Sequence, residues 1–136
     1  MKIVLDDGAF MPTRAHEWDA GLDLRTPKRV VLHQHDSVVI DTGVHVEIPE
    51  GYVGLLKSKS GLNVKHDIIG EGTIDAGYTG SIHVKLYNLG YIDYVFSKGD
   101  KIIQLVITPI ILPKLEVVER LNETDRGDGG FGSSGK

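Results

Sequence analysis

The sequence contains no cysteine and only one tryptophan among its 136 residues. Without cysteine, disulfide bonds and thiolate metal sites are excluded, which is compatible with a reducing compartment. Positive charge is also scarce, because 15 Lys and Arg residues face 19 Asp and Glu residues and the formal net charge is -4. Such a chain has no general positive field for DNA or RNA, so we expect no nucleic-acid polymer as a partner. A small anionic ligand needs only local positive charge.

Long apolar runs are also missing. No stretch approaches the roughly 20 apolar residues that a membrane span needs. The first ten residues alternate acidic and apolar side chains, which is unlike the basic and then apolar pattern of a secretory leader. We therefore expect neither export nor membrane insertion, and a location in the cytoplasm, or in the host cytoplasm for a viral protein.

Short β-strands dominate the patterns that are present. Apolar residues alternate with polar ones in 44–48 and 81–87, and this period of two is typical of half-buried strands. Further runs rich in β-branched residues, separated by turn residues, occupy 29–32, 37–40, 52–56, 91–96, 102–107 and 115–118. No window shows sustained helical periodicity, so we expect at most a turn or two of helix. The pattern predicts one all-β domain, a barrel or a sandwich.

The end of the chain differs from the rest. Residues 122–136 are rich in glycine and contain one large apolar residue, Phe131. Such a segment buries too little surface to offset its ordering entropy. We expect a β-barrel domain over residues 1–121 and a mobile segment over residues 122–136, which is either a dispensable terminus or a lid.

Two other segments carry residues suited to chemistry. Residues 72–80 hold Asp75 and Tyr78 between glycines, which could supply a base and a flat stacking surface or form a plain turn. Residues 57–62 hold two lysines, two serines and a glycine, which suit a phosphate site or form a solvated basic loop. Trp18 is most simply a core or interface anchor. Any metal ion here should be Mg²⁺, held mainly by substrate phosphates.

Five segments in this order resemble the five motifs of the trimeric dUTPase family: residues 20–24, 59–62, 72–80, 99–105 and 126–135. The resemblance implies a dUTPase-like β-barrel or jelly-roll (β-clip) fold. It also implies hydrolysis of dUTP to dUMP and pyrophosphate with Mg²⁺, by attack of water on the α-phosphate, which supplies dUMP for dTTP synthesis and keeps uracil out of DNA. A homotrimer with shared active sites is expected.

The same resemblance assigns roles around the nucleoside. Asp75 would be the general base that activates the attacking water. Tyr78 would pack on the deoxyribose where a 2′-hydroxyl would sit. Backbone groups of Gly72, Thr73 and Ile74, near His83, would bind the uracil edge.

Other residues would act on the triphosphate. By the resemblance, Lys59, Ser60 and Gly61 would hold phosphates, with Gln104 near the α- and β-phosphates. Asp23 would contact Mg²⁺ through water. In the tail, Arg126 would reach the γ-phosphate and Phe131 would cover uracil, and Gly132 and Ser133 belong to the same substrate-binding segment.

Four residues, in three segments, depart from the family pattern. Ser58-Lys59 replaces the usual Pro-Arg, and a lysine gives a point charge where an arginine binds bidentately. Leu22 stands where tyrosine is common. Glu71 lies in the segment before Asp75, where its negative charge would face an anionic substrate without evident reason.

Two alternatives belong to other activities. A dCTP deaminase of the same fold would open cytosine deamination with a glutamate. A dUTP-responsive regulator would use the fold to bind a protein partner, alone or in addition to catalysis.

Overall fold

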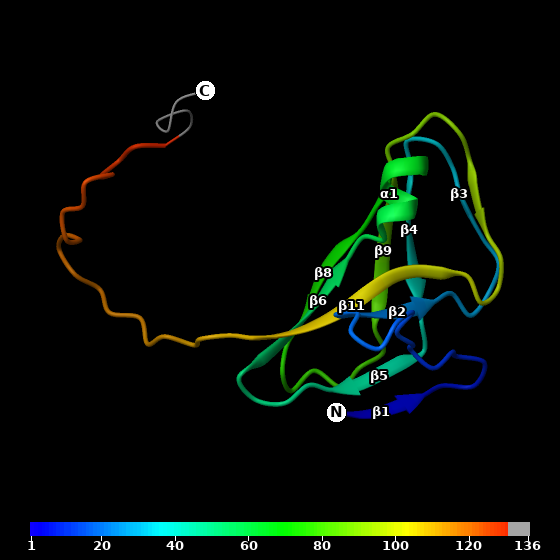
Figure 1. Cartoon of the computed structure of the whole chain (residues 1–136), viewed down its shortest axis with the longest axis horizontal. Helices are drawn as coiled ribbons and strands as arrows, with labels where there is room; N and C mark the ends of the chain where they lie inside the picture. The colour runs from blue at the N-terminus through cyan, green and yellow to red at the C-terminus, as the bar shows by residue number, and fades with distance from the viewer. Residues whose placement is uncertain (131–136) are drawn as a thin grey trace.

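The computed structural model describes residues 1–130. The predicted site residues Phe131, Gly132 and Ser133 lie outside the described residues. The described part forms a body of antiparallel strands with one short helix, and an arm that runs away from the body after the last strand (Figure 1). The all-β prediction is confirmed.

Two larger antiparallel sheets make up most of the body. The four-stranded sheet has the order β2-β11-β6-β8, and the three-stranded sheet has the order β4-β9-β7. Two further pairs, β1-β5 and β3-β10, complete it. The strands are β1 (Lys2–Leu5), β2 (Gly21–Arg25), β3 (Val30–Leu32), β4 (Ser37–Asp41), β5 (Val44–Glu47), β6 (Tyr52–Lys57), β7 (Ile68–Ile69), β8 (Glu71–Ile74), β9 (His83–Asn88), β10 (Tyr94–Phe96) and β11 (Lys101–Pro109).

The core lies between these sheets and follows the period of two. On β9, Val84 and Leu86 are buried while the residues between them are exposed. Strand β11 is buried at Ile102, Ile103 and Leu105, because it lies between β2 and β6 in the middle of its sheet. Burial of such aliphatic side chains is the main favourable contribution to folding.

The helix α1 (Ser60–His66) begins after Ser58 and Lys59, the two residues that follow the end of β6 at Lys57. It ends at Asp67, whose backbone takes the left-handed conformation with φ of 53° and donates its N–H to the carbonyls of Asn63 and Leu62. Leu62 is its buried anchor. The helix fixes the direction in which the chain leaves β6 and so helps to position Lys59, the residue that precedes the helix. Within residues 1–130, no helix is long and apolar enough to cross a membrane.

The prediction of a strand over residues 115–118 is wrong. The chain leaves the body after the backbone N–H of Ile110 donates to the carbonyl of Gly51 at 2.9 Å. Beyond that point no strand forms among the described residues, because no other strand of the body lies beside the arm (Figure 1). Leu115 and Val117 are 95% and 100% exposed. Trp18 is 90% exposed, so of the two roles expected for it the core anchor is wrong.

Candidate functional site

A polar pocket of about 370 Å³ lies where β2, β6 and β11 approach one another. Its walls come from the loop before β2, from β2 itself, from the end of β6 and from the middle of β11. The lining residues are Ala15, Asp19, Ala20, Gly21, Asp23, Lys57, Lys59, Gln104 and Val106. The pocket therefore brings together predicted site residues from three separate motifs.

The charged centre of this pocket is Asp23, which is only 4% exposed. Lys59 contacts one carboxylate oxygen, and the ammonium of Lys101 lies 2.6 Å from the other. Burial alone would raise the pKa of Asp23, but the hydrogen bonds and charges of Lys101 and Lys59 outweigh it and lower that pKa. The carboxylate is thus held ionised in a place where an unpaired charge would be costly.

Gln104 lies opposite Asp23 in the β2–β11 register. Its amide donates to the carbonyl of Ser58 at 3.2 Å. It also packs so closely on Gly21 that a Cβ atom there would lie 2.1 Å from the Gln104 side-chain oxygen. Glycine at position 21 is therefore required for Gln104 to keep its place.

The structure explains why a serine stands at position 58. Its hydroxyl donates to the carbonyl of Gly70 and accepts from the backbone N–H of the same residue, both at 2.9 Å. A proline at this position could not make these two bonds. The side chain thereby joins the end of β6 to the segment before β8, next to Lys59.

The structure also accounts for Glu71. Lys57 and Glu71 face each other in the β6–β8 register, and their side chains form an exposed ion pair at 2.9 Å. The hydrogen bond and charge of Lys57 lower the pKa of Glu71. Lys57 therefore already has an anionic partner in Glu71. The side chain of Lys59 is less exposed than that of Lys57. Ser60 and Gly61 follow Lys59 at the start of α1 and are exposed.

A second group of predicted site residues surrounds the turn between β8 and β9. The backbone N–H of Tyr78 donates to the carbonyl of Asp75 at 3.1 Å, which closes the turn, and Gly77 has φ of 92°. The Tyr78 hydroxyl donates to the carbonyl of Ser81 at 3.0 Å. His83 follows at the start of β9, with Nε2 3.5 Å from the carboxylate of Asp41.

Strand β8 is the last strand of its sheet. One edge pairs with β6 through Gly72, Thr73 and Ile74, and the other edge pairs with no strand among residues 1–130. Backbone N–H and C=O groups on such an edge are free to bind a ligand.

The two groups are not brought together within one chain. Because β8 runs antiparallel to β6, Lys57 faces Glu71 and Gly54 faces Ile74. These two facing pairs lie three residues apart along the strands, which is about 10 Å. Lys59 continues beyond one end and Asp75 beyond the other, so the separation of these two is larger still. Arg126 is exposed on the arm, where its Nε donates to the carbonyl of Gly129 at 3.0 Å.

Sequence reasoning missed Lys101 as a site residue. No local pattern identifies it, since its role depends on the pairing of β11 with β2, which places Lys101 opposite Arg25 and lets its side chain reach the carboxylate of Asp23. Ser58 was expected as one of the two serines of the phosphate-site segment 57–62 and as a departure from the family pattern, and its bonds to Gly70 depend equally on the fold.

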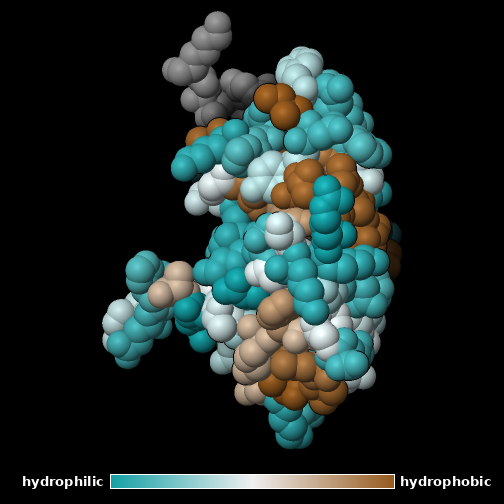
Figure 2. Space-filling view, turned by 90° about the vertical axis from the view of Figure 1, so that its right-hand side faces the viewer, coloured by the Kyte–Doolittle hydropathy of each residue, from teal (hydrophilic) through white to brown (hydrophobic). Residues whose placement is uncertain are grey.

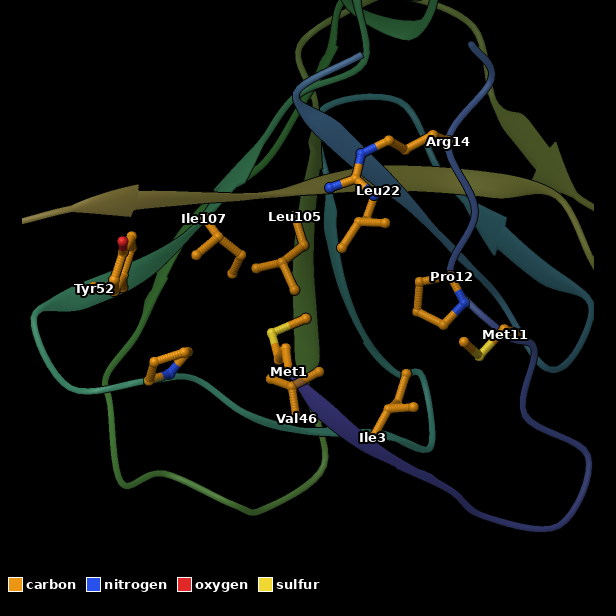
Figure 3. Close-up of a pocket in the computed structure, with 11 residues that line it drawn as sticks. Met1, Ile3, Met11, Pro12, Arg14, Leu22, Val46, Tyr52, Leu105 and Ile107 are labelled. Carbon is orange, nitrogen blue, oxygen red and sulfur yellow. The ribbon is translucent and has the colours of Figure 1, made fainter. Parts of the chain in front are cut away.

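A second pocket, of about 420 Å³, lies between the β1-β5 pair and the sheet formed by β2 and β11 (Figure 3). Its lining is mostly apolar, with the guanidinium of Arg14 at its rim. The lining residues are Met1, Ile3, Met11, Pro12, Arg14, Leu22, Val46, Pro49, Tyr52, Leu105 and Ile107. Leu22, which replaces the usual tyrosine, points into this pocket.

Comparison with known proteins identifies relatives over nearly the whole chain. The deoxyuridine 5'-triphosphate nucleotidohydrolase of Clostridium acetobutylicum is 42% identical over 134 residues, covering 96% of this chain and 92% of that protein. The protein of the same name from Mus musculus is 39% identical and covers 97% of this chain and 82% of its own length.

Solved structures agree. A mutant dUTPase of Staphylococcus bacteriophage 80alpha with dUpNHpp superposes with a TM-score of 0.93 at 37% identity, covering 99% of this chain and 98% of that chain. A mutant dUTPase from phage phi11 of S. aureus, described as coordinating a structural Mg(II) ion, gives a TM-score of 0.83 at 35% identity over 90% of this chain and 98% of its own. The dUTPase-like fold is thus confirmed. With the dUTPase family model matching residues 7–135, the chain belongs to the dUTPase family.

Proposed function

We propose that the protein hydrolyses dUTP to dUMP and pyrophosphate by attack of water on the α-phosphate. Hydrolysis of this nucleotide is the activity for which its relatives are named. The observation that carries the proposal is the pocket around Asp23, which Lys59 lines and in which Lys101 holds the second oxygen of the Asp23 carboxylate, on a chain of net negative charge. The product would feed dTTP synthesis, and removal of dUTP would keep uracil out of DNA.

Lys59 is the proposed phosphate ligand. Its ammonium contacts Asp23 in the absence of substrate, and a triphosphate offers it a more highly charged partner. Lys101 stays on the other oxygen of Asp23, so the buried carboxylate keeps one cation when Lys59 turns to the phosphates. Ser60, Gly61 and the amide of Gln104 complete the phosphate-binding set.

Mg²⁺ fits this site as an ion carried by the substrate. Among residues 1–130 no group of three or more His, Asp or Glu residues could hold a metal ion by itself. Asp23 offers carboxylate oxygens at the pocket for a contact through water, which is the usual pattern for Mg²⁺ held mainly by phosphates. When bound, the ion would neutralise charge that develops on the phosphates.

The nucleoside end is proposed at the β8–β9 turn. The free edge of β8 at Gly72, Thr73 and Ile74 supplies backbone donors and acceptors for the uracil edge, and His83 begins β9 on the other side of the turn. Tyr78, held by its hydrogen bond to Ser81, excludes a ribose 2′-hydroxyl by its bulk.

Asp75 begins this turn and is exposed, so a water molecule can reach its carboxylate. In the proposed reaction it takes the proton of the attacking water, and the P–O bond to the pyrophosphate leaving group breaks as the new bond to the α-phosphorus forms.

A homotrimer with shared sites is the proposed assembly. The carrying argument is the separation, within one chain, of Lys59 from Asp75 by more than about 10 Å along the strands. A second copy that places its β8–β9 turn over the Asp23 pocket would unite them.

The arm supports this assembly. Several of its apolar side chains are largely exposed in the described part of the chain, where Ile111, Leu115 and Leu121 are 86% to 95% exposed. Apolar residues also gather in patches on the face of the body shown in Figure 2. The apolar pocket of Figure 3 could accept such side chains from a neighbouring copy. Residues 122–136, with Arg126 and Phe131, are proposed as the lid.

Mixed trimers test the shared site. Asp75→Asn and Lys59→Met are each expected to be inactive alone. When the two variants are unfolded and refolded together, activity returns only if Asp75 and Lys59 of one site come from different chains. A site built within one chain always contains one of the two changes, so the mixture would then stay inactive.

Substrate choice tests the reaction itself. Pyrophosphate release should be fast with dUTP and slow with UTP, dCTP and dTTP. Ammonia released from dCTP, without pyrophosphate from dUTP, would identify the chain as a deaminase instead.

One relative, the phage 80alpha protein, is described as controlling transfer of virulence genes by a G protein-like mechanism. We propose that the chain binds a protein partner in a nucleotide-dependent way in addition to catalysis. The test is whether the immobilised chain retains a protein to a different extent with and without dUpNHpp. A cytoplasmic location is proposed on the absence of cysteine alone.

A further inference from the structure

The turn that carries Tyr78 is fastened by side chains from other segments. The carbonyl of Thr79 accepts a hydrogen bond from Nδ1 of His45 on β5, at 2.8 Å. The hydroxyl of Ser81 donates to Asp41 at the end of β4. Since the hydroxyl of Tyr78 in turn donates to the carbonyl of Ser81, these contacts set the position of the Tyr78 ring.

His45 is itself held in place. Its Nε2 atom lies 3.2 Å from a carboxylate oxygen of Asp6, in the segment that follows β1. Its side chain is 27% exposed, so the two contacts are partly shielded from water. Asp6, His45 and Thr79 therefore form a row of contacts that joins three segments far apart in the sequence.

We propose that His45 is a positioning residue for sugar selection: its imidazolium bridges Asp6 and the Thr79 carbonyl and so fixes the turn that carries Tyr78. This inference rests on the proposed role of Tyr78 in excluding the ribose 2′-hydroxyl. His45 itself touches no substrate group in this scheme.

The protonation state of His45 decides whether the bridge is complete. A doubly protonated ring donates at both nitrogens, whereas a neutral ring donates at only one. If the neutral ring keeps its bond to Thr79, its bare Nε2 faces the carboxylate of Asp6. Protonation therefore adds one charge-assisted hydrogen bond and removes an unfavourable contact.

The surroundings favour the protonated form. The hydrogen bond to Thr79, and then that to Asp6, raise the pKa of His45 above its ordinary value, and the charge of Asp41 acts in the same direction. His83 also lies near Asp41, with Nε2 3.5 Å from its carboxylate, and the phenol of Tyr78 lies in the turn. Because the pKa is raised, the bridge is complete below about pH 6.5 and is lost as the pH rises through the raised value.

The test is the ratio of kcat/KM for dUTP to that for UTP, measured from pH 5.5 to pH 9. Both substrates carry the same triphosphate and metal ion, so pH effects on these groups and on the chemical step cancel in the ratio. In the unchanged protein the ratio should fall severalfold as the pH rises. In His45→Ala it should be about tenfold lower at low pH, for the loss of a hydrogen bond, and independent of pH.

Three further variants sharpen the test. In His45→Asn the amide can still donate to Thr79 but has no donor for Asp6 and does not titrate, so the ratio should be flat, at about the value that the unchanged protein reaches at high pH. In Asp6→Asn the pKa of His45 should move towards its ordinary value, shifting the fall in the ratio to lower pH. The matched control is His33→Ala, which removes another His–Asp pair, with Asp93 at 2.8 Å, away from the turn. It should leave the ratio unchanged.

Several outcomes would overturn the inference. If His45→Ala lowers kcat equally for both substrates and leaves their ratio and its pH dependence unchanged, His45 only supports the fold. If His45→Asn titrates like the unchanged protein, another group is responsible. A failure of the underlying assignment looks different, because Tyr78→Ala would then leave the ratio unchanged, or the unchanged protein would not hydrolyse dUTP at all.

Discussion

The ammonium of Lys101 lies 2.6 Å from Oδ2 of Asp23, while Lys59 contacts Oδ1 of the same carboxylate. A nearly buried anion therefore has a cation on each oxygen. One of these cations, Lys59, is the proposed phosphate ligand. The other, Lys101, is what keeps Asp23 from being left unpaired when phosphates compete for Lys59.

Lys101→Met should destabilise the fold by about 1–3 kcal/mol, because it removes a charged hydrogen bond from a buried carboxylate. The pKa of Asp23 is lowered in the folded state, so its stabilisation is present above the ordinary value of about 4 and is lost as the pH falls through the lowered one. Urea unfolding between pH 2 and pH 6 should thus depend less on pH in the variant. Lys98→Met, at an exposed position, is the control, and an equal loss in both variants would refute the argument.

Gly21→Ala should weaken substrate binding at the phosphate end. The added methyl group would lie 2.1 Å from the side-chain oxygen of Gln104, so the amide must leave Ser58. We expect KM for dUTP to rise by roughly tenfold, for one hydrogen bond misplaced. For the effect on folding the comparison is Gly61→Ala, where no atom lies within 4 Å of the new Cβ. This variant should unfold at the same urea concentration as the unchanged protein, or at a higher one. An unchanged KM in Gly21→Ala would remove Gln104 from the binding set.

Asp75→Asn should lower kcat by about 100-fold to 10,000-fold, because an amide cannot accept the proton of the attacking water. Binding of dUpNHpp, measured by calorimetry, should change little, since the amide has nearly the same shape. Near-normal turnover in this variant would show that the base lies elsewhere.

A chain that ends after Asp125 should fold and assemble like the full chain, because the described part of the removed segment is almost wholly exposed. Turnover should fall on the order of 100-fold through loss of Arg126 and Phe131. Circular dichroism and light scattering give the fold and the mass. Loss of folding or of assembly in the truncated chain would contradict the proposed lid.

The sequence predicted the strands whose side chains alternate most clearly. Residues 44–48 and 81–87 were identified because one face of each strand is buried, and β5 and β9 occupy those segments. Strand β2 was not predicted, because glycine and aspartate are uncommon in strands. Asp23 is accommodated there because the side chains of two lysines pair with its carboxylate.

The same limit applies to the arm. Leu115, Val117 and Val118 have the composition of a strand, but a strand also requires a partner for its backbone, and the described chain offers none. Local composition shows that these side chains are apolar and does not show which surface would cover them. Likewise, local patterns indicated Lys59 and Asp75 as site residues but gave no information on the distance between them, which depends on the direction of β8.

Because of the exposed apolar arm, the stability and activity of this protein should depend on its concentration. If the arm is covered only on assembly, the assembled form is stabilised by mass action, and dilution favours separate chains. The midpoint of thermal unfolding should then rise with protein concentration, and specific activity should fall on prolonged dilution. A cell that makes little of this protein would accordingly hold fewer complete sites than its number of chains suggests.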